Sequence, residues 1–200
     1  MAKARPITGI DAQASTGKNA RIIARTRLEE MESWGQYAHD PQRTDELHNL
    51  RIAAKRLRYT LEIFADALPK ECEAFVEEVT QIQEELGSLH DGDVMIALLR
   101  SCLDFQHDEN SGTERNTNGK QALAVQAQQK AGKHLIANLD LVTYLVDPRA
   151  MPSQAERKGL ERLLLDIQQR REEQYAAFRR HWDQLQTRDF FHELLSLLDA

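Results

Sequence analysis

A row of basic side chains with helical spacing is the feature of this sequence that is best suited to bind a ligand. Its members stand three or four residues apart and are His48, Arg51, Lys55 and Arg58. A helix would place all of them along one face. Guanidinium groups bind phosphate through paired hydrogen bonds, and lysine adds a compact positive charge. The pattern therefore predicts a surface for a ligand with repeated phosphate groups, to which the histidine adds a further donor.

Apolar residues border the basic row on both sides of the expected helix. On one side lie Leu50, Leu57 and Leu61, and on the other lie Ile52, Tyr59 and Ile63. A fully solvated charged face would have polar neighbours, so we expect the row to be partly enclosed. Enclosed cations need anionic partners, because an unpaired buried ion costs several kcal/mol. Glu62 follows Arg58 by four residues and would orient its guanidinium group through an ion pair.

A second group of bases precedes the row with similar spacing. Its members are Lys18, Arg21 and Arg25, on an expected helix whose apolar seam contains Ala24, Leu28 and Met31. Because Arg21 shares the heptad register of Leu28, we expect these bases to point inward. Arg56, next to Lys55 in the chain, is a further candidate ligand. The alternative interpretation of all these cations is a set of surface charges that pair with acids on a neighbouring helix.

An arginine interrupts the apolar seam of a long helix that we expect from about residue 153 to residue 185. Arg171 lies in this seam, which also contains Ile167 and Phe178. The side chain either pairs with a carboxylate of the core or points inward as a phosphate ligand, and the pattern supports both interpretations. Arg180 lies on a second basic stripe of the same helix and is also a candidate ligand.

Signatures of common catalytic sites do not occur in the sequence. It contains no P-loop, GxSxG, HExxH, CxxC or glycine-rich dinucleotide turn. The segment His90-Asp91-Gly92-Asp93 brings two carboxylates and an imidazole together, so a phosphohydrolase that uses the two aspartates is kept as an alternative. The simpler interpretation makes either aspartate a helix cap, because the segment precedes an apolar period. We expect no catalytic residue, no metal and no cofactor.

Composition indicates a helical protein without disulfides. The 200 residues include 41% hydrophobic residues but only five prolines and nine glycines, which favours an all-α chain. This length suits one domain or two small bundles that share a core. Two cysteines, Cys72 and Cys102, form no disulfide framework and no metal-ligand spacing. We expect a cytoplasmic protein, since the sequence shows neither a signal peptide nor an apolar stretch that could enter a membrane.

Charge is unevenly distributed along the chain, which has a net charge of −6. Residues 18–58 contain nine Lys and Arg against six Asp and Glu, whereas residues 69–114 contain two against twelve. The negative total disfavours a general nucleic-acid binder. We expect a solvated face for most acids of the following helix, and these are Glu71, Glu73, Glu77, Glu78, Glu84 and Glu85.

Periodicity and capping residues predict the order of the helices. After a flexible tail at 1–15, helices are expected at about 18–39, 47–68, 70–86, 91–106, 120–144, 153–185 and 188–198, with a mobile loop at 107–119. Ser15, Thr44 and Thr187 are expected N-caps. Gly87 is an expected left-handed helix end, and Ser153 with Glu156 has the pattern of a capping box.

The basic row also belongs to a longer pattern that resembles the CHAD family, the conserved histidine α-helical domain. The pattern reads His48-x-x-Arg51-x-x-x-Lys55-Arg56-x-Arg58-Tyr59-x-x-Glu62, followed by Gln83-x-x-Leu86-Gly87-x-x-x-Asp91-x-x-Val94. The resemblance implies two packed four-helix bundles within residues 16–200, arranged around a basic central channel. It also implies binding of inorganic polyphosphate, often at polyphosphate granules.

Transfer of the family pattern by position gives five candidate ligands, namely His48, Arg51, Lys55, Arg56 and Arg58. The helical spacing adds Lys18, Arg21, Arg25, Arg171 and Arg180. Family members commonly carry a second, weaker copy of the basic helix, but this sequence has one full copy, so the channel is either shallower or completed by another subunit. The triphosphate-tunnel domain that often accompanies the family, with its Glu-x-Glu-x-Lys strand, has no counterpart in the sequence.

The resulting hypothesis is a non-enzymatic domain that binds inorganic polyphosphate and does not bind membranes. The sequence does not define its oligomeric state. A nucleic-acid binder is the first alternative, disfavoured by the negative charge and by the scarcity of aromatic residues near the basic row. A phosphohydrolase acting through Asp91 and Asp93 is the second.

Overall fold

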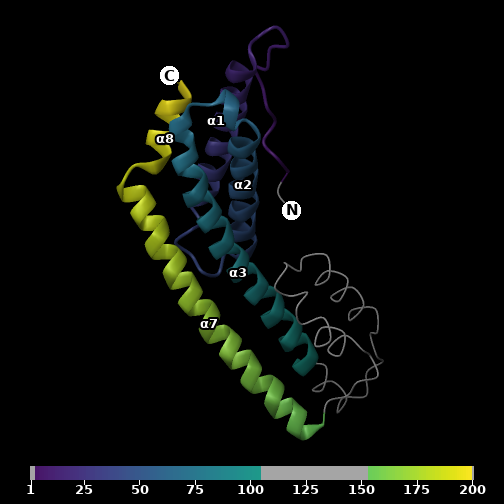
Figure 1. Cartoon of the computed structure of the whole chain (residues 1–200). Coiled ribbons are helices and arrows are strands. Elements are labelled where there is room, and N and C mark those ends of the chain that lie inside the picture. The colour runs from purple at the N-terminus through teal and green to yellow at the C-terminus, as the bar shows by residue number, and fades with distance from the viewer. Residues whose placement is uncertain (1–2, 105–152, 200) are drawn as a thin grey trace. The chain divides into compact units, whose positions relative to one another are not determined.

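Helices form every regular element of the described chain. The computed structural model describes residues 3–104 and 153–199, and no strand occurs in these two ranges. The all-α class is therefore confirmed (Figure 1). The loop predicted at 107–119 and the helix predicted at 120–144 lie outside the described residues. None of the described helices combines the length and the apolar character that crossing a membrane requires.

Two compact units divide the chain. The first contains Met1–Gly87 and Tyr175–Ala200, and the second contains Ser88–Gln174. Two long helices, α3 (Glu73–Asp104) and α7 (Gln154–Thr187), contribute one segment to each unit. Each unit has its own group of buried hydrophobic residues. The predicted pair of four-helix bundles and the predicted channel stay predictions.

The first unit is built on two consecutive helices that lie side by side, α1 (Thr16–Gly35) and α2 (Thr44–Ile63) (Figure 1). The hydroxyl of Ser15 accepts a hydrogen bond of 3.2 Å from the backbone N–H of Lys18, which confirms the predicted cap. The N-cap of α2 is Arg43, without a side-chain hydrogen bond. The prediction of Thr44 as this cap was therefore wrong.

The segment before α1 is attached to that helix by polar contacts. Asp11 and Asn19 exchange hydrogen bonds of 3.1 and 2.8 Å, and Arg5 pairs with Glu29 at 3.2 Å. These residues are exposed, so each ion pair contributes little to the free energy of unfolding.

Helix α1 ends at Gly35, four residues before the predicted end at residue 39. Gly35 is buried against the indole of Trp182 in α7, and a Cβ atom at this position would lie 2.5 Å from Cζ2 of that ring. A glycine is needed here because no other residue leaves room for the indole. The chain then turns through residues 36–43 into α2.

Helix α3 runs without interruption through the point where two helices were predicted. The prediction that Gly87 caps one helix and that Asp91 or Asp93 caps the next was wrong, because all three residues lie inside Glu73–Asp104. An interior glycine costs a helix about 1 kcal/mol. Buried leucines before and after it, Leu86 and Leu89, contribute more than this through their removal from water.

Helix α2 ends at Ile63, earlier than predicted, and two short 3-10 turns lead into α3. These turns are η1 (Ala65–Ala67) and η2 (Lys70–Cys72). Residues from every helix of the first unit form its core, and they include Met31, Leu50, Leu57, Val79, Ile82, Phe178, Trp182, Phe190 and Leu194.

The last helix, α8 (Phe190–Asp199), packs against α1. Thr187 is the final residue of α7, where its hydroxyl donates to the carbonyl oxygen of Asp183 at 2.8 Å. The prediction of Thr187 as the N-cap of α8 was wrong, since Asp189, with φ of 60°, makes the turn between the two helices.

The second unit has a small hydrophobic core between its segments of α3 and α7. Its buried residues are Met95, Leu98, Leu99 and Leu160. The predicted capping box begins α7: the N–H of Ser153 donates to Glu156 Oε2 at 2.7 Å, and the N–H of Glu156 donates to Ser153 Oγ at 3.4 Å. Its reciprocal bonds satisfy two donors that a helix start otherwise leaves unpaired.

Candidate anion-binding site

The four residues of the basic row lie on α2, as the spacing predicted. His48, Arg51 and Arg58 are half-buried, and Lys55 is exposed. Leu50, Leu57 and Leu61 on one side of the row are buried. On the other side, Tyr59 is 42% exposed and Ile63 is 75% exposed. The expectation of an apolar border that encloses both sides is therefore corrected: the second side is half-buried at Ile52 and open to solvent at Tyr59 and Ile63.

The side chain of Arg51 packs against α3 at Gly87. A Cβ atom on Gly87 would lie 3.3 Å from Arg51 Nε, which is closer than most side-chain contacts, so the glycine makes room for the guanidinium group. The Nε atom is shielded from solvent and has no hydrogen-bond partner. No described carboxylate pairs with Arg51. Its remaining donors are therefore available for an anion.

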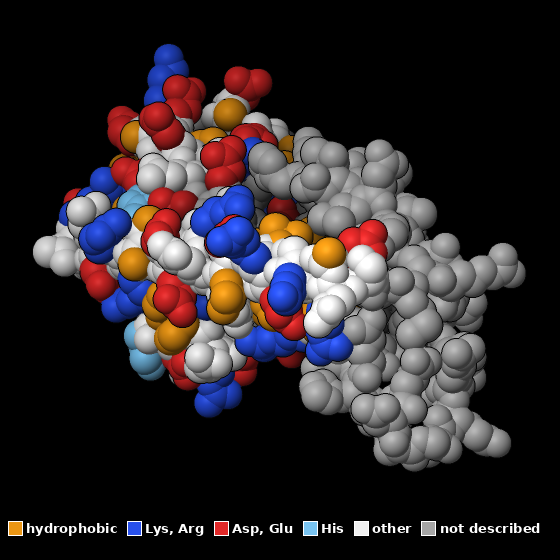
Figure 2. Space-filling view, turned by 90° about the horizontal axis from the view of Figure 1, so that it is seen from below, with side chains coloured by type: hydrophobic (Ala, Val, Ile, Leu, Met, Phe, Trp, Pro, Cys, Tyr) orange, Lys and Arg blue, Asp and Glu red, His pale blue; other side chains and the backbone are white. Residues whose placement is uncertain are grey.

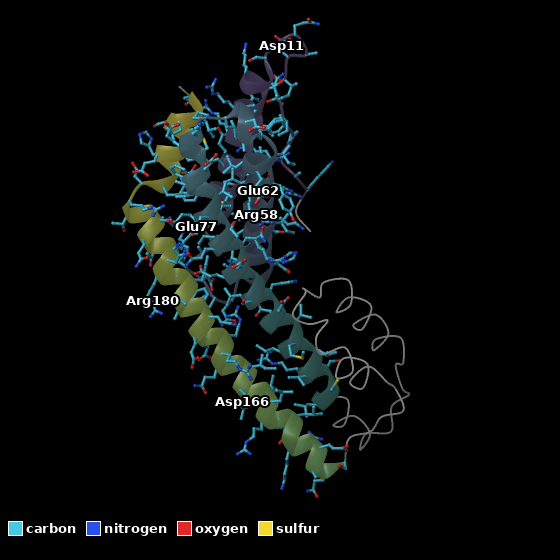
Figure 3. The ribbon with its side chains drawn as sticks, in the orientation of Figure 1. Asp11, Arg58, Glu62, Glu77, Asp166 and Arg180 are labelled. Atoms are coloured by element: carbon cyan, nitrogen blue, oxygen red, sulfur yellow. The ribbon has the colours of Figure 1, made fainter. Side chains whose placement is uncertain are left out.

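Arg58 is held mainly by a ring contact and only loosely by a carboxylate. Its Nε atom is also shielded and without a hydrogen-bond partner. The Cζ atom lies 4.7 Å from the centre of the Tyr59 ring. Glu62 Oε1 is 3.7 Å from Arg58 Nη1, a distance too long for a hydrogen bond. Figure 3 shows the two side chains together on α2, so the predicted ion pair exists but leaves the donors of Arg58 largely unused.

Arg21 is the third arginine with a shielded Nε that has no hydrogen-bond partner. Its positive charge acts on the thiol of Cys72 in the η2 turn. Burial and the neighbouring Glu71 carboxylate raise the pKa of this thiol, and the positive charge of Arg21 partly opposes them.

The other two bases of the group predicted on α1, Lys18 and Arg25, do not point inward. Lys18 and Arg25 are exposed. The guanidinium group of Arg25 pairs with Glu29 at 3.2 Å and with Asp199 of α8 at 2.8 Å. The expectation that Lys18, Arg21 and Arg25 all point inward is therefore corrected, because of these three only Arg21 is partly buried. Opposite charges on α1 and α8 explain the orientation of Arg25.

Arg56 faces a buried carboxylate. Glu30 of α1 is 3% exposed. It accepts hydrogen bonds from Arg56 and, at 2.7 Å, from Arg27. One negative charge is thus shared by two guanidinium groups, which links α1 to α2. A phosphate that recruited Arg56 would have to compete with this internal partner.

In the second unit, Arg171 pairs with a carboxylate of α3. Its Nε and Nη2 atoms donate to Asp93 at 2.6 and 3.4 Å. The sequence left two interpretations of Arg171, a pair with a carboxylate of the core or a phosphate ligand, and this contact corresponds to the first. The same contact occupies one of the two aspartates of the alternative phosphohydrolase. Arg180 is exposed and lies on the outer edge of α7 in Figure 3.

Two residues that the helical spacing did not select lie on the face of α3 that Arg51 touches. Gly87 was predicted as a helix end, and Gln83 was noted only as part of the CHAD family pattern. Gln83 stands one helical turn before Gly87, and its Oε1 atom is shielded without a hydrogen-bond partner. A neighbouring helix supplies the contact to Gly87, so periodicity within one helix gives no signal for it.

A half-buried histidine joins α7 to α3 within the first unit. His181 Nε2 lies 3.0 Å from Glu78 Oε2, and its Nδ1 lies 3.0 Å from Glu85 Oε2. Arg188 also pairs with Glu78 at 2.7 Å. The expectation of a solvated acidic face is corrected for these two glutamates, which are half-buried. Sequence reasoning missed the cluster because its histidine follows the glutamates by 96 and 103 residues.

The His181 cluster makes the free energy of unfolding depend on pH. Burial alone would lower the pKa of His181, but its hydrogen bonds to Glu78 and Glu85 raise it above the ordinary 6.5. This stabilising contribution is complete below pH 6.5 and is lost as the pH rises through the folded-state pKa. For Glu78, burial opposes the hydrogen bonds from His181 and Arg188, yet the pKa falls below 4.5, so its contribution is lost in acid.

We therefore expect the native protein to exceed a His181→Gln variant in stability most clearly between about pH 4.5 and 6.5, where both contributions are present. Urea unfolding of the two proteins across this range measures the difference. A His192→Gln variant is the control, because His192 is exposed on α8. A constant difference between native protein and His181→Gln from pH 5 to pH 9 would contradict the prediction.

Charges of both signs are interspersed on the face shown in Figure 2. On that face, Lys and Arg side chains alternate with Asp and Glu and do not form one continuous basic field. Across residues 3–104 and 153–199, no group of three or more His, Cys, Asp and Glu side chains is arranged to hold a metal ion.

The described elements define an all-α protein in which a hairpin of helices carries a row of basic side chains along its second member. Residues 2–100 match the family model of the CHAD domain. Through this segment the chain belongs to the CHAD family. No curated protein and no solved structure matches the chain.

Proposed function

We propose that this protein binds inorganic polyphosphate without cleaving it, through the basic row of α2 and Arg21. The observation that carries the proposal is the state of three arginines. The Nε atoms of Arg21, Arg51 and Arg58 are shielded from water and have no hydrogen-bond partner. Shielded donors without partners are costly and uncommon in proteins. An anion that enters the site would supply the missing acceptors.

The spacing of the row favours a ligand with several phosphates over a single one. Along a helix with a rise of 1.5 Å per residue, Arg51 and Arg58 are separated by about 10 Å. A single phosphate group covers only part of this distance, whereas a chain of phosphates can follow the row. Membership of the CHAD family supports the same ligand class, and a cytoplasmic location at polyphosphate granules belongs to the proposal.

Two alternatives make different predictions. A nucleic-acid binder needs aromatic platforms or a broad basic field, and the net charge of −6 disfavours such a binder. A phosphohydrolase would need Asp93 as a reactive carboxylate, but Arg171 already binds that side chain. We therefore prefer a binding domain.

Affinity for long-chain polyphosphate is the direct test of the proposal, measured by calorimetry in a salt series. If about three phosphates are contacted, log K should fall with log salt with a slope of about −2, by analogy with single-stranded nucleic acids. Equal displacement of polyphosphate by RNA at the same phosphate concentration would favour the first alternative. Phosphate release with Mg²⁺ or Mn²⁺ that is lost in an Asp93→Asn variant would favour the second.

A further inference from the structure

Tyr59 contacts both neighbouring cations of the basic row. Lys55 Nζ lies 5.6 Å from the centre of the tyrosine ring, and Arg58 Cζ lies 4.7 Å from it. The ring is 42% exposed, so packing against the core does not account for an aromatic residue at this position. Its contacts instead connect it to the two side chains that the proposed function uses.

A ring holds a cation differently from a carboxylate. The face of an aromatic ring attracts a guanidinium or ammonium group through its quadrupole. A carboxylate occupies the N–H donors and neutralises the charge, whereas a ring contact leaves both the donors and the charge available. Arg58 shows this state, because its nearest carboxylate oxygen, on Glu62, is 3.7 Å away.

We propose that Tyr59 is a positioning residue that holds Lys55 and Arg58 ready for phosphate and keeps Arg58 from closing onto Glu62. The inference rests on the proposed polyphosphate function. Without the ring, the existing ion pair of Arg58 and Glu62, now 3.7 Å apart, would close to hydrogen-bonding distance. Lys55, whose side chain is exposed, would lose its only described contact and become more mobile. Binding would then require both side chains to be ordered again.

Polyphosphate affinity of Tyr59→Leu and Tyr59→Phe variants tests the proposal. The leucine variant should bind about tenfold more weakly, since two side chains lose their preorganisation. The phenylalanine variant keeps the ring and should stay within about twofold of the native protein. Ile63→Ala is the matched control, because Ile63 is the next exposed apolar residue on α2 at 75% exposure and has no role in the proposal.

The coupling between positions 59 and 62 provides a readout that a general structural defect would not change. In a Glu62→Gln background, the loss caused by Tyr59→Leu should shrink to about threefold, because the competing carboxylate is gone. Equal thermal stability of all variants is expected from the exposure of Tyr59.

The positioning role of Tyr59 would be overturned if the Tyr59→Leu variant bound polyphosphate as tightly as the native protein. It would also be overturned if Tyr59→Leu and Tyr59→Phe lost the same affinity. Neither result would contradict the proposed binding of polyphosphate. Failure of the native protein to bind polyphosphate would overturn the proposed function and this inference together. A tenfold loss of affinity in Tyr59→Leu that is the same with and without the Glu62 carboxylate would also contradict the proposal that Tyr59 keeps Arg58 away from Glu62.

Discussion

Replacement of Arg51, Lys55 and Arg58 together by alanine should remove nearly all polyphosphate affinity. Each hydrogen bond from a charged donor is worth about 1.5 to 3 kcal/mol, so three lost donors correspond to at least about 4 kcal/mol. This equals roughly a thousandfold weaker binding. Calorimetric titration of long-chain polyphosphate at constant salt measures the effect, and the slope of affinity against salt should fall as contacts are lost.

Two controls separate this loss from general effects of charge and folding. Lys3, Arg100 and Lys158 are exposed, and their joint replacement by alanine removes the same positive charge elsewhere in the described chain. This control variant should bind within about threefold of the native protein, because exposed distant charges are screened by salt. Circular dichroism should show unchanged helix content in both triple variants. Equal affinities of the two triple variants would argue against the basic row as the binding site.

Glu30→Ala should cause the largest loss of stability among single substitutions of charged residues in the first unit. The carboxylate is 3% exposed and serves Arg27 and Arg56 together. Removal of one partner from a buried ion pair costs about 3 to 5 kcal/mol, because the remaining charge is left without compensation. For a chain of this size, the midpoint of thermal unfolding should fall by about 10 °C.

Glu29 is a suitable comparison for Glu30. It is the preceding residue of α1, its side chain is 38% exposed, and it also serves two arginines, Arg5 and Arg25. Glu29→Ala should cost about 1 kcal/mol or less, as exposed ion pairs do. Chemical denaturation of both variants measures the difference. Similar losses in the two variants would show that the burial of the Glu30 cluster does not matter for stability.

The Glu30 variant also has a consequence for binding. Loss of this carboxylate removes one partner of Arg56, which is one of the candidate ligands from the family pattern. Tighter polyphosphate binding by a folded Glu30→Gln variant would indicate that Arg56 can join the basic row, and unchanged binding would indicate that it serves the structure alone.

Local periodicity was sufficient to predict much of the fold. The apolar repeats that contain Leu28, Leu57, Val79 and Phe178 predicted helices whose inner faces are buried. Ser15 and Ser153 predicted helix starts because caps act on the two or three residues that follow them. Such features depend on neighbours within one or two turns, so they are visible in the sequence.

Helix ends that depend on another helix were predicted poorly. Gly35 and Gly87 look alike in the sequence, but the first ends α1 beside Trp182 and the second lies inside α3 beside Arg51. The side chain that approaches each glycine comes from a residue far away in the chain. No local propensity contains that information.

The sequence by itself determined the all-α class, the family and the positions of the basic residues along α2, since these follow from composition and short spacings. Tertiary structure decided which cations are available. Arg25, Arg56 and Arg171 meet carboxylates that are 174, 26 and 78 residues away in the chain, whereas Arg21 and Arg51 meet no described carboxylate. Charges interact according to their distance in space and their exposure to water, and only the packing of helices defines both.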